Sequence, residues 1–269
     1  MLFSIIIPTC NRNNLLAKCL NCLQYEVQGL SATDYEVIVT DDSYNNLAKD
    51  FLTINFPWVQ WVEGPKRGPA ANRNNGAKYA KGEWLVFLDD DCVPESTILK
   101  AYQNAINCYQ NATVFEGKVI AERQKKSLAE EAPINEQGGY LWSCNFLIKK
   151  LLFTEIEGFD ENFPYPAMED IDLQIRLQKL TTIIFVNEAV VMHPWKIIKP
   201  FTSIIKHLQS HKYFARKQKV YGTFSYRWSR CKIFFGQFFL ITKELVGFSG
   251  RGFFIYIERN ILNFLLIFY

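Results

Sequence analysis

The chain has 269 residues, of which 49% are hydrophobic and 15% aromatic, a composition that supports a large core and argues against a disordered chain. The net charge of +3 hides an uneven distribution: residues 1–194 carry 17 Lys and Arg against 25 Asp and Glu, whereas residues 195–269 carry 13 against 2. We therefore expect an acidic body and a basic C-terminal segment that meets an anionic partner.

The first part of the chain predicts a strand followed by a helix. Residues 3–8 (FSIIIP) form a short apolar run typical of a buried strand, and residues 11–24 begin with polar residues and continue with helical apolar spacing. Cys19 and Cys22 have CxxC spacing but no second pair that would complete a zinc site, so we interpret them as core residues of this helix. The start of the chain lacks the basic residues and long apolar stretch of a signal peptide, which predicts the cytosol.

The next elements alternate between strands and helices. Residues 35–43 (YEVIVTDDS) predict a strand, residues 68–82 a loop that leads into a helix, and residues 83–91 (EWLVFLDDD) another buried strand. Such alternation predicts an α/β fold with a parallel sheet and helices on both faces. In such sheets ligands bind outside the carboxyl ends of the strands, where the aspartates of these two strands lie.

Three adjacent carboxylates, Asp89, Asp90 and Asp91, need a counter-charge. One interpretation is a solvated acidic turn, and the other is a site for a hard divalent cation, Mg²⁺ or Mn²⁺. Adjacent side chains at a strand end point in different directions, so the three cannot all be ligands. A second acidic pair, Asp41 and Asp42, favours the ligand site, because such a pair suits the base and ribose of a nucleotide.

The remainder of the body predicts four further elements: a helix near residues 95–106, a strand near residues 112–120, a helix over residues 169–180 with acids in its first turn, and two short strands over residues 182–186 and 189–194.

Four blocks of this sequence occur in an order that resembles the family 2 glycosyltransferases of GT-A fold. The blocks are SIIIPTCNRN (4–13), VIVTDDS (37–43), residues 68–94 with LDDD, and residues 158–177 with MEDIDL. The resemblance covers residues 3–195. It implies a GT-A (Rossmann-like), mostly parallel sheet flanked by helices as a catalytic domain over residues 1–195, with residues 196–269 as a helical basic and aromatic extension.

The resemblance also implies an activity. The family uses nucleotide-activated sugars and a divalent metal, and it inverts the anomeric centre. We therefore expect a UDP-sugar donor, Mn²⁺ or Mg²⁺ as cofactor, and a saccharide or lipid-linked acceptor, in polysaccharide, lipopolysaccharide or glycolipid synthesis.

Matching the family's motifs position by position assigns expected roles. The donor side comprises Pro8, Thr9, Asn11, Arg12, Asp41, Asp42, Arg73, Asp89 and Asp90. The metal ligands are Asp89, Asp91 and His193, and the catalytic base is Asp170. The acceptor side comprises Gly138, Gly139, Trp142, Asn145 and Glu169. The segment ANRNNG stands where ARN.G is usual, a small departure that leaves Arg73 in place.

Each role fits the chemistry and has a structural alternative. The transition state resembles an oxocarbenium ion, so a metal that neutralises the departing diphosphate and a carboxylate that takes the acceptor proton are both needed. Asp170 is otherwise a helix N-cap, a role that Glu169 and Asp172 can share, with Asp172 also spaced for an ion pair with Arg176. Arg73 is otherwise a surface residue, and His193 a strand-end histidine with a satisfied hydrogen bond.

The C-terminal segment has no run of ~18 apolar residues that could span a membrane. Basic residues interleaved with Phe, Tyr and Ile predict a helix at an anionic membrane surface, and therefore a peripheral location on the inner face of the cell membrane. The alternative is packing on the catalytic domain or on a second subunit, which leaves a homo-oligomer open. No nucleic-acid-binding module is recognisable.

Two other functions remain as alternatives. A sugar nucleotidyltransferase would need a glycine-rich, lysine-bearing segment soon after the first strand, and PTCNRNN contains no glycine. A non-catalytic, membrane-bound scaffold of the same fold is opposed by the presence of Asp42, Asp89, Asp91 and Asp170.

Overall fold

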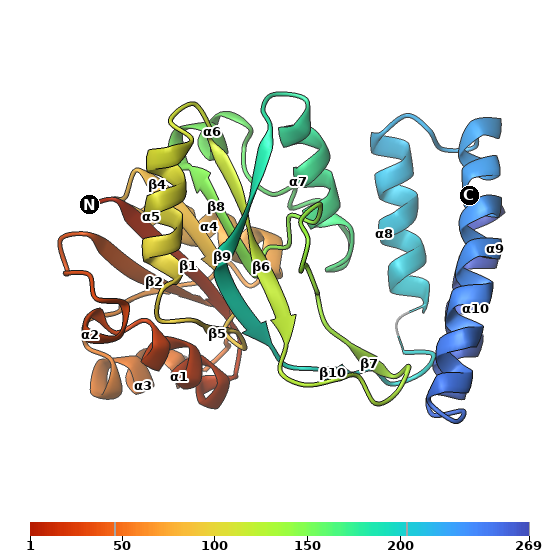
Figure 1. Cartoon of the computed structure of the whole chain (residues 1–269), viewed down its shortest axis with the longest axis horizontal. Coiled ribbons are helices and arrows are strands. Elements are labelled where there is room, and N and C mark those ends of the chain that lie inside the picture. The colour runs from red at the N-terminus through yellow and green to blue at the C-terminus, as the bar shows by residue number, and fades with distance from the viewer. Residues whose placement is uncertain (46, 203, 269) are drawn as a thin grey trace. The chain divides into compact units, whose positions relative to one another are not determined.

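The structure is a computed structural model that describes residues 1–45, 47–202 and 204–268 (Figure 1). It contains two compact units. The first comprises residues 1–122, 133–161 and 169–194, and the second residues 123–132, 162–168 and 195–269. The sequence predicted a boundary at residue 195, close to the point where the chain last passes from the first unit into the second. It did not indicate that two internal segments belong with the C-terminal helices.

The first unit is built on one sheet, which has eight strands within the described residues, in the order β3-β2-β1-β4-β8-β6-β9-β5. The strands are β1 (Phe3–Thr9), β2 (Tyr35–Asp41), β3 (Gln60–Glu63), β4 (Trp84–Leu88), β5 (Val93–Pro94), β6 (Val114–Ala121), β8 (Asn145–Lys149) and β9 (Ile183–His193). Strand β8 runs antiparallel to β4 and β6, and β5 antiparallel to β9, while the other pairs are parallel. The predicted mostly parallel sheet is confirmed.

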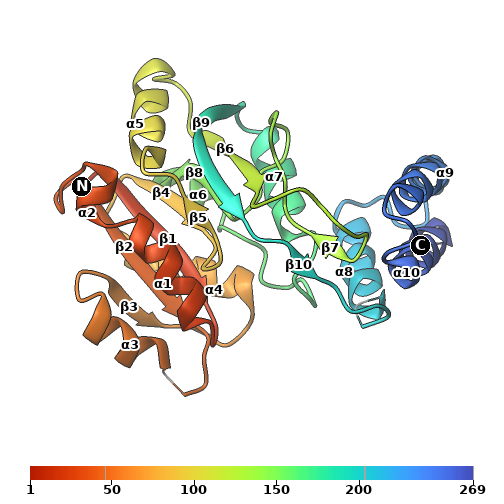
Figure 2. The same ribbon diagram turned by 60° about the horizontal axis from the view of Figure 1, so that its bottom comes forward.

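Helices cover both faces of this sheet, as predicted (Figure 2). They are α1 (Asn13–Cys22), α2 (Tyr25–Gln28), α3 (Leu47–Asn55), α4 (Pro69–Tyr79), α5 (Ile98–Cys108), α6 (Lys150–Glu155) and α7 (Glu169–Gln178). Alternate strand residues point to opposite faces: Ile5 and Ile7 pack with α1, α3 and α5, whereas Ile6 packs with α4, α6 and α7. The core is therefore two apolar layers, one on each side of the sheet.

The two short strands expected over residues 182–186 and 189–194 are wrong, because they form the single strand β9. Its pairing with β6 shifts abruptly: Gly117 is in register with Val186, but Lys118 is in register with Val190. The intervening residues of β9 bulge out of the ladder. The polar pair Asn187–Glu188, which separates the two apolar runs in the sequence, lies at this bulge.

The second unit is mainly helical, which confirms the predicted helical C-terminal segment. It contains the antiparallel pair β7 (Glu130–Glu131) and β10 (Lys196–Ile197), helices α8 (Ile204–Lys217), α9 (Phe224–Gly247) and α10 (Phe253–Leu265), and a 3₁₀ turn (Leu266–Phe268). Helices α9 and α10 pack side by side (Figures 1 and 2). Among the helices that the structure describes, none combines the length and hydropathy needed to cross a bilayer.

Candidate active site

The carboxyl ends of β1, β2 and β4 meet at one edge of the sheet, and helix α4 ties them together. Asn72 of α4 is buried, accepts a hydrogen bond from the Thr40 hydroxyl (2.6 Å) and donates one to the Thr40 carbonyl (2.9 Å). Gly76 allows the close approach, because a Cβ there would lie 2.6 Å from Ile6 Cγ2. This packing brings Arg73, one residue after Asn72, to the edge where the strands end.

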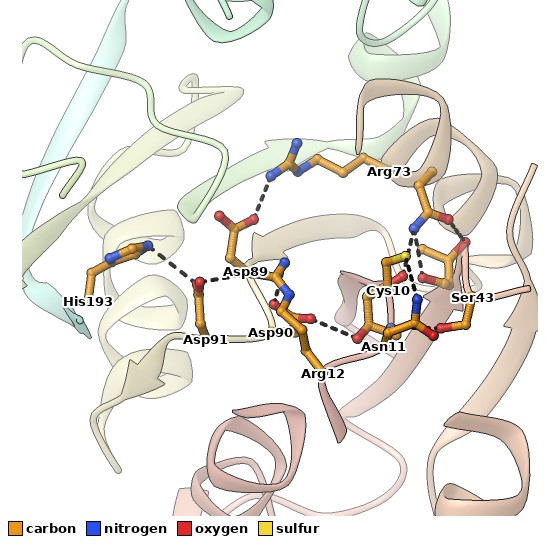
Figure 3. A network of polar contacts seen from close by, with 12 residues as sticks. Cys10, Asn11, Arg12, Ser43, Arg73, Asp89, Asp90, Asp91 and His193 are labelled. Atoms are coloured by element: carbon orange, nitrogen blue, oxygen red, sulfur yellow. Dashed lines mark hydrogen bonds and ion pairs between the residues drawn. The ribbon is translucent and has the colours of Figure 1, made fainter. Parts of the chain in front are cut away.

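Asp89 and Asp90, the first two acids of the run, have different cationic partners (Figure 3). Asp89 Oδ1 pairs with Arg73 Nη2 at 2.5 Å. Asp90 is fully buried, accepts a hydrogen bond from the Thr9 hydroxyl at 2.7 Å and pairs with Arg12 at 2.8 Å. Burial raises the pKa of Asp90 to about 6, although the Arg12 charge opposes the rise. Asp89 and Asp90 are therefore each paired with a different arginine, which reduces the repulsion within the run.

Asp91 points toward the end of β9, where His193 lies (Figure 3). Asp91 Oδ1 is 3.3 Å from His193 Nε2, both side chains are almost completely buried, and a second Asp91 oxygen is 3.2 Å from Arg12. The Nδ1 atom of His193 lies 2.7 Å from the Pro194 carbonyl oxygen, which can only accept, so Nδ1 is the donor of this hydrogen bond and Nε2 faces Asp91.

This arrangement fits a divalent cation. Within the described part of the chain, His193 Nε2 makes no hydrogen bond, and Asp91, Cys92 and His193 offer ligand atoms within 4.8 Å of one another. A carboxylate and an imidazole are suitable ligands for Mn²⁺, which accepts oxygen and nitrogen donors. Burial raises the pKa of the Cys92 thiol well above its ordinary value, which leaves Asp91 and His193 as the stronger candidates. Asp89, the third predicted ligand, is paired with Arg73 instead.

A second acidic pair begins helix α7. Asp170 accepts hydrogen bonds from the Ser143 amide (3.3 Å) and hydroxyl (3.2 Å) through Oδ2, while Oδ1 has no hydrogen-bond partner in the described chain. Burial raises the pKa of Asp170, and burial together with repulsion from Asp170 raises the pKa of Glu169 to about 7. A carboxylate with a raised pKa and an unengaged oxygen has the properties of a general base.

Arg73 links the two acidic groups electrostatically. Its guanidinium is buried and lies 5.6 Å from the ring centroid of Phe159. Although burial alone would lower it, the charges of Asp89, Asp170 and Glu169 raise the pKa of Arg73 above its ordinary value. The guanidinium thus remains charged between the strand-end acids and the α7 pair.

Asp172 has the structural role that its spacing indicated. It is fully buried and pairs with Arg176 at 2.8 Å, which confirms the expected intrahelical ion pair. Arg176 also donates to the carbonyl oxygens of Ile156 and Gly158 at 2.9 and 2.7 Å. Asp172 therefore fixes α7 to the segment before it, while Asp170 retains an oxygen for chemistry.

The two acids at the end of β2, Asp41 and Asp42, differ in what they can contact. Asp41 is fully buried and accepts hydrogen bonds from the Ser43 amide (2.9 Å) and the Trp61 indole (3.3 Å). Asp42 is 9% exposed and accepts a hydrogen bond from the Lys66 amide at 2.8 Å, while burial raises its pKa. Asp41 thus shapes the loop, and Asp42 is the better placed of the two to contact a ligand.

The loop after β1 mainly holds other residues of the site in place. Pro8 is buried within β1, and the Thr9 hydroxyl is engaged with Asp90. Asn11 has a left-handed backbone (φ 56°), and its amide donates to the Ser43 hydroxyl at 2.8 Å, which joins the loops after β1 and β2 (Figure 3). Arg12, with a side chain that is 40% exposed, is the cation of this loop that a ligand can reach.

The predicted acceptor-side loop is attached to the sheet and to α7. The Gly139 amide donates to Glu116 Oε1 at 2.7 Å, and Gln174 of α7 donates to the Gly139 carbonyl at 2.9 Å. Gly138 and Gly139 have φ values of 84° and 102°, which favour glycine. Trp142 stacks on Tyr140, which is 55% exposed, with centroids 5.5 Å apart. The partly buried Trp142 and the exposed Tyr140 thus form a stacked aromatic surface on which a sugar ring could lie.

Asn145 requires a correction, because the structure places it inside the sheet rather than on a ligand surface. It is 1% exposed, its amide donates to the carbonyls of Lys118 (2.9 Å) and Ala189 (2.8 Å), and it accepts from the Tyr102 hydroxyl (2.7 Å). It bridges β6 and β9 at the bulge, where a Cβ on Gly117 would lie 2.2 Å from its Nδ2. Its polar atoms are satisfied within the protein, so we assign it a structural role.

Three residues of this site were missed in the sequence. Cys92 directly follows the acidic run, Ser143 orients Asp170, and Tyr140 pairs with Trp142. The segment YLWS (residues 140–143) carries two of them and could have been noticed as an aromatic pair beside a hydroxyl. No pattern in the sequence links Ser143 with Asp170, which lies 27 positions later.

The chain matches the model of glycosyl transferase family 2 over residues 4–151. This match covers more than half of the chain and includes the strand-end acids and Arg73. The chain therefore belongs to glycosyl transferase family 2, as the motifs indicated.

Similar proteins of this family come from several bacteria. A Campylobacter jejuni GalNAc(5)-diNAcBac-PP-undecaprenol beta-1,3-glucosyltransferase is 30% identical over 60% of this chain and 55% of its own length. The putative colanic acid biosynthesis glycosyl transferase WcaA of Escherichia coli K12 is 24% identical over 83% of this chain and 86% of its own length. The chain thus spans little more than half of the first of these relatives.

The fold is shared with solved structures. Staphylococcus aureus TarS 1–349 superposes with a TM-score of 0.62 at 19% identity, covering 81% of this chain and 65% of that one. The same protein in complex with UDP-GlcNAc superposes with a TM-score of 0.60 at 20% identity, covering 81% and 66%. These similarities confirm the predicted GT-A fold.

Proposed function

We propose that this chain is a metal-dependent glycosyltransferase that moves a sugar from a nucleotide-sugar donor to an acceptor hydroxyl, with inversion of the anomeric centre. The observation that carries the proposal is the presence at one sheet edge of two sites. One is the Asp91–His193 pair, suited to a divalent cation, and the other is Asp170, with an oxygen free of hydrogen bonds. Family membership and the crystallised complex of TarS with UDP-GlcNAc support a UDP-sugar as donor.

Each group has a defined role in the proposed donor site. Asp42 receives the nucleoside, and Arg12 and Arg73 bind phosphate oxygens, for which a guanidinium is well suited. Asp91 and His193 hold Mn²⁺ or Mg²⁺, with Asp89 available once Arg73 turns to phosphate. The bound cation would neutralise the charge that develops on the departing diphosphate.

The proposed transfer is a single displacement. The acceptor hydroxyl attacks the anomeric carbon from the face opposite the diphosphate, and Asp170 takes the hydroxyl proton. The bond between the anomeric carbon and the phosphate oxygen breaks, and the nucleoside diphosphate leaves with the electron pair. Ser143 holds Asp170 through Oδ2, which leaves Oδ1 for the proton. Because attack and departure occur on opposite faces, the product is inverted.

The names of two relatives and the basic, aromatic C-terminal segment support proposals for the acceptor and the location. The C. jejuni relative is named for an undecaprenol-linked substrate, and a further relative, 34% identical over 38% of this chain and 17% of its own length, is a poly(ribitol-phosphate) beta-glucosyltransferase of Bacillus spizizenii. We therefore propose a saccharide or lipid-linked acceptor, with the protein on the cytoplasmic face of the membrane. Residues 1–195 are the proposed catalytic domain, and the Tyr140–Trp142 pair is the proposed surface for the acceptor sugar.

Release of nucleoside diphosphate tests the proposal. The full chain is incubated with Mn²⁺ and a panel of UDP-, GDP-, dTDP- and CDP-sugars, with water or added saccharides as acceptor. One donor should be turned over, and Asp170→Asn should reduce this rate by roughly two to four orders of magnitude without weakening donor binding. Asp50→Asn, the same change at an exposed position of α3, should have no effect. Absence of turnover with every donor would favour a non-catalytic scaffold, and release of pyrophosphate from a nucleoside triphosphate would favour a nucleotidyltransferase.

A further inference from the structure

Helices α9 and α10 carry a continuous surface of aromatic rings. We name as the aromatic surface nine residues: Phe234, Phe235, Phe238, Phe239, Phe253, Phe254, Tyr256, Phe264 and Phe268. Neighbouring ring centroids are 5.2–6.3 Å apart, and the contacts join all nine into one group. All of them except Phe234 and Tyr256 are at least 37% exposed.

Helix α9 extends this surface along its length. Only Ile241 is buried among its 24 residues. Phe224, Trp228, Phe235, Phe239 and Val246 recur at helical spacing and project within an arc of about 60° at 3.6 residues per turn. Their side chains are 55–81% exposed. A helix face that contacts water normally carries polar side chains. An exposed apolar arc of this kind therefore indicates a face that contacts an apolar partner.

Positive charge borders the apolar arc. Lys232 and Lys243 project next to it on α9, and both are exposed. The acids of residues 195–269 are engaged inside the second unit: Glu244 pairs with Lys125 at 3.1 Å, and Glu258 accepts a hydrogen bond from the Phe201 amide at 2.7 Å. The surface that these helices offer is therefore aromatic and cationic.

We propose that the aromatic surface docks on the surface of an anionic lipid bilayer, with α9 and α10 lying in the plane of the membrane. Aromatic rings suit the boundary between headgroups and acyl chains, while lysine side chains at the edge of such a helix reach lipid phosphates. A second copy of the chain is a poorer partner, because pairing through this face would bring two segments of net charge +11 together. The inference rests on the peripheral location proposed above and names the surface responsible.

Vesicle sedimentation tests this assignment with the full chain and no substrate. Wild-type protein should sediment with phosphatidylcholine vesicles that contain phosphatidylglycerol and bind pure phosphatidylcholine vesicles much less. The double variant Phe235→Glu/Phe239→Glu should lose roughly tenfold or more in affinity, because two rings leave the interface and two charges oppose it. Lys232→Glu/Lys243→Glu should lose the preference for phosphatidylglycerol.

A matched control uses exposed apolar residues of the first unit. Ile54→Glu/Leu151→Glu changes side chains that are 78% and 73% exposed and should leave vesicle binding unchanged. All variants should retain the wild-type circular dichroism spectrum and release nucleoside diphosphate in solution at the wild-type rate, which separates membrane docking from catalysis. Wild-type protein that ignores both kinds of vesicle would overturn the proposal. So would a Phe235→Glu/Phe239→Glu variant that binds normally, or a wild-type dimer that this variant dissociates without any vesicle binding.

Discussion

Arg12 pairs with Asp91, a proposed metal ligand, and with the neighbouring Asp90, so its replacement should strengthen metal binding. Its guanidinium lies 2.8 Å from Asp90 Oδ1 and 3.2 Å from Asp91 Oδ2. The two carboxylate side chains are 0% and 2% exposed, whereas the Arg12 side chain is 40% exposed. In Arg12→Gln the two buried carboxylates lose the cation that they share.

The size of the effect follows from this intermediate burial. Removal of one partner from a fully buried ion pair costs about 3–5 kcal/mol, and an exposed pair is worth about 0–1 kcal/mol. In this group the carboxylates are buried but the guanidinium is partly exposed, so we expect the loss of the Arg12 charge to cost about 1–2 kcal/mol. A divalent cation that binds the variant does not have to displace the guanidinium. The free energy of the lost ion pairs is therefore gained in the binding of the metal. At about 1.4 kcal/mol for each factor of ten, Mn²⁺ affinity should rise roughly 5- to 30-fold.

The assay is a calorimetric titration of nucleotide-free protein with Mn²⁺. Arg67→Gln is the matched control, because it breaks an arginine–carboxylate pair with Glu161 (2.6 Å) that includes none of the three acids of the run. Its Mn²⁺ affinity should equal that of the wild type. An Arg12→Gln variant that binds Mn²⁺ no more tightly than wild type would refute the reasoning, and equal tightening in both variants would assign the effect to net charge.

The remaining predictions concern stability. Glu169 has a pKa raised by burial from 4.5 to about 7, so the folded state retains a proton that the unfolded state loses as the pH rises through this window. The free energy of unfolding of nucleotide-free wild type should therefore fall between about pH 4.5 and 7 relative to that of Glu169→Gln; equal curves at pH 4 and pH 8 would contradict the shift. Asn145→Ala should leave the Tyr102 hydroxyl and two carbonyls without partners and destabilise the chain by about 2–4 kcal/mol in urea denaturation. A loss of activity without loss of stability would instead return Asn145 to the acceptor side.

Local patterns were sufficient to predict most of the sheet. Apolar runs such as FSIIIP and EWLVFL predict buried strands, and acids directly after them mark the ligand edge. Strands β5 and β8 were not predicted, and neither was their antiparallel direction, because the local sequence does not indicate which way a strand runs in the sheet. The sequence predicted two short strands where β9 is continuous, because the polar pair Asn187–Glu188 interrupts the apolar run and the partner strand β6 lies far away in the sequence.

The acidic residues of the site could be predicted from the sequence, but the side-chain contacts between them and the basic residues could not. Strand-end position marks Asp42, Asp89 and Asp91 as candidates. The ion pairs of Arg12 with Asp90 and Asp91 join residues 78 and 79 positions apart, and no local pattern encodes them. Asn145 was assigned by resemblance alone, and only the structure shows that its amide is consumed by the sheet.

The measurement that tests the account most directly is calorimetry of UDP binding to the full chain with Mn²⁺ and with EDTA, in the wild type and in Asp91→Asn. If Asp91 and His193 hold a cation that bridges the diphosphate, Mn²⁺ should strengthen UDP binding to the wild type by roughly tenfold or more. Asp91→Asn should bind UDP weakly and equally in both conditions. A wild type that binds UDP as tightly in EDTA as in Mn²⁺, or a variant that keeps the Mn²⁺ effect, would contradict a metal-dependent donor site at these residues.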